Sequence, residues 1–309
     1  MGHALLLAAL LAGGCPEQQE VLEQAADAIE RRYVTADEAR QVAGAVRGWS
    51  ATGRHADACG DWPAFIARLN RDLDAYDGHF HVERLLAEKA GGDDDWLMAW
   101  RAAGIPTNMG VREVRVFEGN VGYLRLASFY PWDMAGPKIR NALELVEETQ
   151  GLVVDLRGNG GGDDQTAGQL VRAFLGDDLD AVQHIQARAG DRPDPLPARD
   201  VPAYRGRVVV LLDRRSASAS EFVAYVLQAA GRAVVVGSRS AGAATMLGDP
   251  LPLAHGVQIF VPEAQPVSTV TGGNWNGTGV VPDVRGGDDP VHVARRIIAG
   301  DLEVPAGAK

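Results

Sequence analysis

The second half of the sequence alternates short apolar runs with segments of helix length, and this alternation limits the possible folds most strongly. Residues 151–156 (Gly-Leu-Val-Val-Asp-Leu), 207–212 (Arg-Val-Val-Val-Leu-Leu) and 233–236 are apolar runs of strand length. Helical patterns follow the first two runs, at residues 166–175 and 221–230. Because parallel strands need crossover connections, which helices commonly supply, the pattern predicts an α/β core with a mostly parallel sheet.

The first third of the chain is predominantly helical in pattern. Apolar residues recur at helical spacing over residues 20–49, with an interruption at Tyr33-Val34-Thr35. A further helix is expected over residues 61–74, with Asp61 as its N-cap. We therefore expect a small helical bundle in front of the α/β core. The predicted division is a signal at 1–14, an N-terminal helical domain at 15–88, a linker at 89–109, the core at 110–300 and a tail at 301–309.

The N-terminus predicts an export signal. Residues 4–11 (Ala-Leu-Leu-Leu-Ala-Ala-Leu-Leu) are apolar but shorter than the ~18 residues that a membrane span needs. Small residues follow, and Cys15 comes directly after them as in a bacterial lipoprotein cleavage box. We expect a periplasmic protein, or one attached to the membrane through lipidated Cys15, which would leave Cys59 as a buried small side chain. If the signal interpretation fails, the alternative is a Cys15–Cys59 disulfide, which an oxidising compartment permits.

The charge balance argues against a nucleic-acid partner. The chain has 41 Asp and Glu against 30 Lys and Arg, a formal net charge of −11. A protein that binds nucleic acid through its backbone phosphates needs an excess of positive charge, and this composition lacks it. A metal site is not expected either, because His79 and His81 are two imidazoles without an evident third ligand.

A glycine-rich loop follows the first buried strand, at residues 155–162 (Asp-Leu-Arg-Gly-Asn-Gly-Gly-Gly). Such a loop can aim backbone N–H groups at a phosphate or at a developing oxyanion. A dinucleotide fingerprint starting at Gly158 would need glycine where Asp163 stands, and no Lys-Ser or Lys-Thr pair makes a P-loop. No cofactor is therefore expected, and an oxyanion hole is the remaining interpretation.

A serine-rich junction, residues 216–221 (Ser-Ala-Ser-Ala-Ser-Glu), lies between the second strand and its helix. A serine at such a turn lies near a helix N-terminus, which stabilises negative charge. Taken alone, the segment is also typical of a serine N-cap with Glu221 in the first helical turn.

Together these motifs resemble the serine peptidase family that groups C-terminal processing (tail-specific) proteases, the tricorn core protease and interphotoreceptor retinoid-binding protein. Residues 155–162 are similar to the family's Asp-Leu-Arg-x-Asn-x-Gly-Gly signature, and residues 216–221 are similar to its nucleophile segment. Gly279-Val-Val-Pro-Asp283 resembles its Gly-Val-x-Pro-Asp motif. The resemblance covers about residues 20–298 and is strongest to the retinoid-binding and tricorn-like branch, without a PDZ domain.

The resemblance implies a ClpP/crotonase-like ββα spiral core with Ser218 as nucleophile. Where processing proteases have a lysine base this chain has Ala243, so the tricorn-like base, matched by His79, is expected instead. Asn276 matches the residue that orients the histidine. The oxyanion donors would be backbone N–H groups of Gly160 or Gly161 and of Ala219, with Glu221 and Arg157 in supporting positions.

The sequence thus favours an exported serine peptidase that acts on peptides or proteins through a Ser/His pair. Arg157 either binds a substrate carboxylate or forms a structural ion pair. One alternative function is a non-catalytic protein that binds a hydrophobic ligand or a peptide, because relatives in the retinoid-binding branch have this fold. Another is a crotonase-like acyl-CoA enzyme, against which the segment at residues 216–221 argues.

Overall fold

The structure is a computed structural model that describes residues 15–85, 93–176 and 181–304. The predicted signal at 1–14 lies outside these residues, as do parts of the predicted linker and tail. The chain forms two compact units. Unit 1 contains residues 1–90, 185–192 and 245–265, and unit 2 contains residues 91–184, 193–244 and 266–309.

Unit 1 contains the predicted helical bundle. Its helices are α2 (Pro16–Arg32), α3 (Ala36–Thr52) and α4 (Trp62–Asp74), with short 3₁₀ turns η1 (Ala56–Ala58) and η3 (Ala254–Gly256). The break between α2 and α3 lies where the sequence predicts it, and Asp61 caps α4 by accepting a hydrogen bond from Ala64 N at 3.0 Å. Antiparallel strands β1 (His81–Arg84), β11 (Val257–Phe260) and β10 (Leu251–Pro252) complete the unit.

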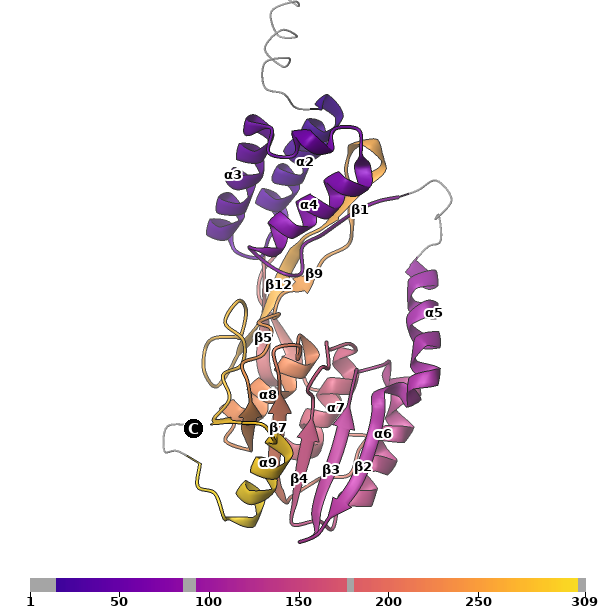
Figure 1. Cartoon of the computed structure of the whole chain (residues 1–309), viewed down its shortest axis with the longest axis vertical. Coiled ribbons are helices and arrows are strands. Elements are labelled where there is room, and N and C mark those ends of the chain that lie inside the picture. The colour runs from indigo at the N-terminus through magenta and orange to yellow at the C-terminus, as the bar shows by residue number, and fades with distance from the viewer. Residues whose placement is uncertain (1–14, 86–92, 177–180, 305–309) are drawn as a thin grey trace, which may run out of the picture. The chain divides into compact units, whose positions relative to one another are not determined.

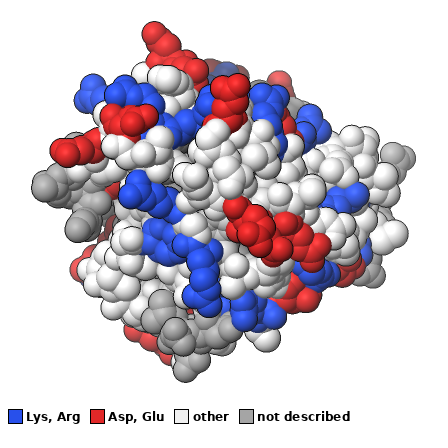
Figure 2. Space-filling model, turned by 90° about the horizontal axis from the view of Figure 1, so that it is seen from below, with Lys and Arg blue, Asp and Glu red and all other residues white. Residues whose placement is uncertain are grey.

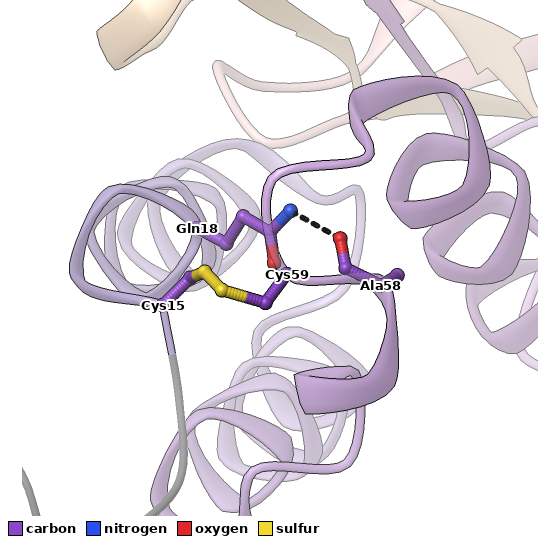
Figure 3. The surroundings of a disulfide bond; sticks show 4 residues. All are labelled: Cys15, Gln18, Ala58 and Cys59. Carbon is purple, nitrogen blue, oxygen red and sulfur yellow. Dashed lines mark hydrogen bonds between the residues drawn. A yellow bond between two sulfur atoms is a disulfide. The ribbon is translucent and has the colours of Figure 1, made fainter.

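A disulfide joins Cys15, at the start of α2, to Cys59, which follows η1. Beside it, Gln18 Nε2 donates a hydrogen bond of 2.8 Å to Ala58 O, so the start of α2 is tied to the η1 segment twice (Figure 3). The bond contradicts the expected lipidation of Cys15 and the expected free Cys59, because one sulfur cannot form a disulfide and a thioether together. The alternative pairing of the two cysteines is the one that the structure contains.

Unit 2 contains a six-stranded sheet in the order β13-β8-β7-β4-β3-β2. Neighbouring strands are parallel, except that β2 and β3 form the predicted antiparallel hairpin. Their bounds are β2 (Val111–Phe117), β3 (Val121–Leu126), β4 (Gly151–Asp155), β7 (Arg207–Leu212), β8 (Ala233–Gly237) and β13 (Val284–Arg285). The mostly parallel core predicted from the alternation is therefore present.

Helices cover both faces of this sheet (Figure 1). Side chains alternate across β4, so Leu152 and Val154 pack in the cluster with α6 (Trp132–Val146), α7 (Asp164–Leu175) and α8 (Ala219–Ala229), while Val153 packs with α9 (Pro290–Ala299). Burial on both faces explains why β4 and β7 are continuous apolar runs in the sequence.

The remaining strands form a four-stranded sheet in the order β6-β5-β12-β9. They are β6 (Arg192–Pro195), β5 (Ala181–Ala187), β12 (Pro262–Ser268) and β9 (Met246–Leu247), and β5 and β12 each carry residues of both units.

The division differs from the expected one in two respects. Residues 245–265 belong to unit 1, although they follow most of the core in the sequence. Helix α5 (Asp93–Gly104) and 3₁₀ helix η2 (Ile105–Gly110) occupy most of the expected linker.

Charges of both signs are interspersed on the face seen in Figure 2. Across residues 15–85, 93–176 and 181–304, no helix is both long and apolar enough to cross a membrane.

Candidate active site

Ser218 is the last residue of the loop between β7 and α8, residues 213–218, where the serine-rich junction was expected. Its backbone has φ 54° and ψ −120°, and it directly precedes the first residue of α8. A positive φ is uncommon for a residue with a side chain, and it persists only where the surrounding structure holds it. The sharp turn leaves Ser218 half-buried while its neighbours Ala219 and Ser220 are buried.

Glu221 holds this turn in place. Its side chain is fully buried, and its two oxygens accept four hydrogen bonds. Oε2 accepts from Ser218 N at 2.9 Å and from Ala243 N at 2.8 Å, while Oε1 accepts from Ser240 Oγ at 2.5 Å and from Gly242 N at 2.6 Å. Burial raises the pKa of Glu221, and the four donors oppose that shift. Glu221 thus connects the Ser218 turn to the loop at residues 240–243.

The glycine loop packs directly against the serine. A Cβ placed on Gly161 would lie 2.8 Å from Ser218 Cβ, and the φ of Gly161 is +101°, so only glycine fits. Asn159, which is fully buried, fixes the loop: its Oδ1 accepts from Gly161 N at 2.9 Å and its Nδ2 donates to Leu126 O at 3.1 Å. The Asn159 carbonyl also accepts from Ala217 N at 3.0 Å and Ser220 Oγ at 2.9 Å.

The three expected oxyanion donors differ in their availability. The Gly161 N–H is already donated to Asn159. Ala219 is the first residue of α8, and N–H groups of a first helical turn have no acceptor within the helix. Gly160 is exposed, and a Cβ built on it would contact nothing within 4 Å. Ala219 N lies 3.0 Å from a Cβ built on Gly161, and Gly160 is the chain neighbour of Gly161.

Arg157 forms an ion pair with a buried carboxylate. Its Nε lies 2.9 Å from Asp155 Oδ1 and its Nη2 lies 2.6 Å from Asp155 Oδ2. Asp155 is fully buried and also accepts from the Tyr123 hydroxyl at 2.8 Å. The hydrogen bond to Asp155 raises the pKa of Arg157. The structural ion pair, one of the two alternatives for Arg157, is therefore present.

His79 lies in unit 1, half-buried, at the turn between α4 and β1. Its Nδ1 is 2.7 Å from Thr245 Oγ1 and 3.3 Å from Asp77 Oδ1. Thr245 Oγ1 is in turn 2.8 Å from Asp77 Oδ2, which also accepts from the Tyr33 hydroxyl at 3.1 Å. Because a hydroxyl has one proton, a Thr245 that donates to Asp77 accepts from the N–H at His79 Nδ1. That arrangement leaves Nε2 as the unprotonated nitrogen.

Asp77 is buried, with 6% of its surface exposed. Burial acts to raise its pKa, but hydrogen bonds from the His79 side chain, the His79 N–H and Thr245 together keep the pKa below its usual value. Asp77 is therefore held as a carboxylate beside the imidazole.

Asn276 makes different contacts. Its Oδ1 accepts from Ala244 N at 3.3 Å, and its N–H is donated to Asn274 Oδ1 at 2.9 Å, all within unit 2. The partners of His79 Nδ1 that the structure places within unit 1 are Asp77 and Thr245.

Sequence analysis missed three residues of this arrangement. Asp77 and His79 are two positions apart, so the spacing was a usable signal for an acid beside the imidazole. Asn159 stands inside the glycine motif. Thr245 gave no signal, because it lies 166 positions after His79. No group of three His, Cys, Asp or Glu suited to a metal occurs among the residues that the structure describes.

Residues 120–285, more than half of the chain, match the family model described as Peptidase family S41. A carboxy-terminal processing protease, CtpB, of Bacillus subtilis is 34% identical over 150 residues, which are 48% of this chain and 30% of that protein. A carboxy-terminal-processing protease of Bartonella bacilliformis is 31% identical over 180 residues, 54% of this chain and 39% of that protein. The chain thus matches about a third of the length of these relatives.

Solved structures resemble most of the chain. A lipoprotein from Streptococcus agalactiae superposes with a TM-score of 0.64 at 14% identity, covering 93% of this chain and 98% of that one. The photosystem II D1 C-terminal processing protease superposes with a TM-score of 0.53 at 20% identity, covering 88% of this chain and 93% of that one. These similarities establish the fold, and the core is of the ClpP/crotonase-like type that the sequence motifs implied.

Proposed function

Because the chain belongs to peptidase family S41, we propose that it is a serine-type peptidase with Ser218 as nucleophile and His79 as general base. The observation that carries the proposal is the backbone of Ser218, at φ 54° between a buried strand and a helix. Strained conformations of this kind cluster at functional sites, where other contacts pay their energetic cost. Here the Glu221 carboxylate supplies those contacts by accepting the Ser218 N–H.

A histidine base suits this chain better than a lysine base. Ala243 stands where the processing proteases that the sequence resembles have their lysine base. An imidazole has an ordinary pKa of ~6.5 and accepts a proton at neutral pH without a perturbed environment. His79 is therefore the base in this proposal, as in the tricorn-like branch that the sequence resembles.

We assign the orientation of His79 to Asp77 and Thr245 in place of Asn276. A carboxylate both fixes the Nδ1–H tautomer and stabilises the imidazolium that forms when Nε2 takes the serine proton, whereas an amide does only the first. The 3.3 Å and 2.7 Å contacts of Nδ1 with Asp77 and Thr245 support this assignment.

Chain connectivity supports the pairing of Ser218 with His79. Ala243 N is bonded to the same Glu221 oxygen as Ser218 N, and Thr245 is bonded to His79. Two peptide units separate Ala243 from Thr245, which limits their Cα atoms to ~8 Å apart. Residues 243–245 thus include one residue that shares the Glu221 carboxylate with Ser218 and one that is hydrogen-bonded to His79.

In the proposed reaction, Ser218 Oγ attacks the scissile carbonyl while His79 Nε2 takes the hydroxyl proton. The backbone N–H groups of Gly160 and Ala219 stabilise the oxyanion, and His79 then protonates the leaving amine. Water hydrolyses the acyl-enzyme with the same histidine as base.

The substrates are peptides or proteins, and we place the enzyme outside the cytoplasm. Residues 4–11 are typical of an export signal, and Cys15 and Cys59 form a disulfide.

The test is labelling of the purified protein with a fluorophosphonate probe, which reacts with activated serines. Wild-type protein is expected to be labelled, and both Ser218→Ala and His79→Ala are expected to lose labelling while keeping the wild-type melting temperature. His81→Ala is the matched control, because His81 is an exposed histidine two residues away, and it should label like wild type. Folded wild-type protein that does not label would overturn the proposal and favour a non-catalytic binding protein.

A further inference from the structure

A pocket of about 700 Å³ opens in unit 2 at the carboxyl ends of four adjacent parallel strands. Arg157 follows β4, Asp213 follows β7, Arg239 follows β8, and Arg285 ends β13. In open parallel sheets ligands usually bind at the carboxyl ends of the strands, because the connecting loops converge there and the helices begin there. The proposed peptidase chemistry uses none of these side chains.

Three arginines line the pocket, although the whole chain carries a net charge of −11. The ion pair with Asp155 holds the Arg157 side chain in one position. Arg239 Nη1 donates to Thr278 O at 2.8 Å, which leaves other N–H groups of its guanidinium available. Arg285 is exposed, and its side chain has no hydrogen bond or ion pair to another residue within the described parts of the chain. The pocket thus has unsatisfied cationic donors.

Two carboxylates also line the pocket. Asp213 Oδ1 accepts from Gly158 N at 3.0 Å and from Arg215 N at 2.9 Å. Burial acts to raise the pKa of Asp213, but those backbone donors keep it below its usual value. Asp288 is exposed to solvent. Because Arg157 is already paired with Asp155, the cations left to a ligand are the Arg239 and Arg285 guanidinium groups. The two carboxylates of the lining are Asp213, which is occupied by backbone donors, and Asp288.

We propose that this pocket binds a carboxylate of the peptide substrate, so that the peptidase prefers acidic peptides. Guanidinium groups form paired hydrogen bonds with carboxylates, which gives both affinity and orientation. The inference rests on the proposed function, since it names the class of peptide that the Ser218 site receives.

Chain geometry limits how far the backbone at Arg157 can lie from the nucleophile. Arg157 is four residues before Gly161, the residue that packs on Ser218, and four Cα steps span at most ~15 Å. An extended peptide advances ~3.3 Å per residue, so this upper limit on the separation of the two Cα atoms corresponds to no more than about five peptide residues. Arg239 adjoins Ser240, which is bonded to Glu221 and through it to Ser218 N. The loops that line the pocket are therefore those that hold the nucleophile.

The experiment measures binding and does not depend on catalysis. Calorimetric titrations use the full chain carrying Ser218→Ala and three pentapeptides: acetyl-Ala-Ala-Glu-Ala-Ala-amide, its Gln counterpart, and the Gln peptide with a free C-terminal carboxylate. Arg285→Gln is the test variant because Arg285 is exposed and its loss leaves no buried group unpaired. Arg112→Gln, an exposed arginine of β2 outside the pocket, is the matched control.

The Glu peptide, the free-carboxylate peptide or both are expected to bind about tenfold more tightly than the capped Gln peptide. Arg285→Gln should remove that advantage, and Arg112→Gln should keep it. Tighter binding of the Glu peptide assigns the pocket to an acidic side chain, and tighter binding of the free-carboxylate peptide assigns it to a chain terminus. Equal binding of all three peptides, or equal losses in both arginine variants, would overturn the proposal. Because fluorophosphonate labelling is a separate measurement, failure of the pocket is distinguishable from failure of the proposed peptidase activity.

Discussion

Ser218 and His79 are held in different ways, although the proposed chemistry needs both. Ser218 is fixed through its backbone: its N–H is donated to the fully buried Glu221, and Gly161 packs on its Cβ. His79 is fixed mainly through its side chain, by Asp77 and Thr245 around Nδ1. The nucleophile therefore depends on the integrity of a turn, and the base depends on a small set of polar side chains.

Because the two residues are held differently, substitutions around Ser218 and around His79 should affect stability and activity to different degrees. A change in the backbone support of Ser218 acts on the core of unit 2, where strands and helices meet. A change in the side-chain support of His79 leaves the helices of unit 1 packed as before. Substitutions in the first group should alter both folding and catalysis, and those in the second should alter catalysis more than folding.

The largest effect is expected from Glu221→Ala. The change leaves four donors without their buried acceptor, so it should lower the free energy of unfolding by about 3–5 kcal/mol and abolish labelling of Ser218. Denaturant unfolding and fluorophosphonate labelling measure the two effects. Glu147→Ala, an exposed glutamate in the same unit, should change neither. Full stability in Glu221→Ala would contradict the role given to this carboxylate.

Removal of the disulfide tests the fold of unit 1. The bond joins residues 44 positions apart, and chain entropy attributes about 4 kcal/mol of stability to a loop of this length. Cys15→Ser with Cys59→Ser should therefore lower the melting temperature of wild-type protein, and a reductant should have no further effect on the double variant. Equal melting of oxidised and reduced wild-type protein would show that the helices alone stabilise this region.

Asp77→Asn should lower activity far more than stability. Loss of the carboxylate should slow labelling of Ser218 by about 10²–10⁴-fold at neutral pH, because the amide stabilises imidazolium poorly. Thr245→Ser keeps the hydroxyl and is the matched control, with labelling close to wild type. An unchanged labelling rate in Asp77→Asn would show that a residue other than Asp77 orients His79.

The same variant has a pH signature. The pKa of Asp77 is lowered in the folded state, so its stabilising contribution is complete above the unfolded-state value of ~3.9. As the pH falls through the lower folded-state pKa, Asp77 takes up a proton and that contribution is lost. Wild-type protein should therefore lose stability below about pH 4 more steeply than Asp77→Asn, as acid unfolding curves would show.

The smallest effect is expected from Asn276→Ala. Its Oδ1 accepts a single long hydrogen bond of 3.3 Å from Ala244 N, so we expect labelling to change by less than about threefold. Labelling rates of this variant and of Asp77→Asn, measured side by side, decide between the two residues. A larger loss in Asn276→Ala than in Asp77→Asn would support the role that the sequence resemblance gives to Asn276.

Local features of the fold could be predicted, and long-range ones could not. The Ser218 turn and the glycine loop each follow an apolar strand, so their positions can be deduced from neighbouring residues. Thr245 contacts His79 across 166 positions, and no local pattern encodes such a pair. The sequence allowed either lipidation of Cys15 or a disulfide with Cys59. Which of the two occurs depends on how α2 and η1 lie in the folded chain, and the structure contains the disulfide. Asp77 was within reach of prediction, but the resemblance directed attention to Asn276.

Unit 1 is assembled from three separate stretches of the chain, and this limits how the protein can be divided by cloning. Val257 and Ile259 of β11 pack in the same apolar cluster as helices α2, α3 and α4, and each is at most 1% exposed. A product that starts after residue 90 would contain these strands without the helices that cover them, and we expect it to aggregate. A soluble form of unit 2 alone would need two further excisions, in which short turns replace residues 185–192 and residues 245–265.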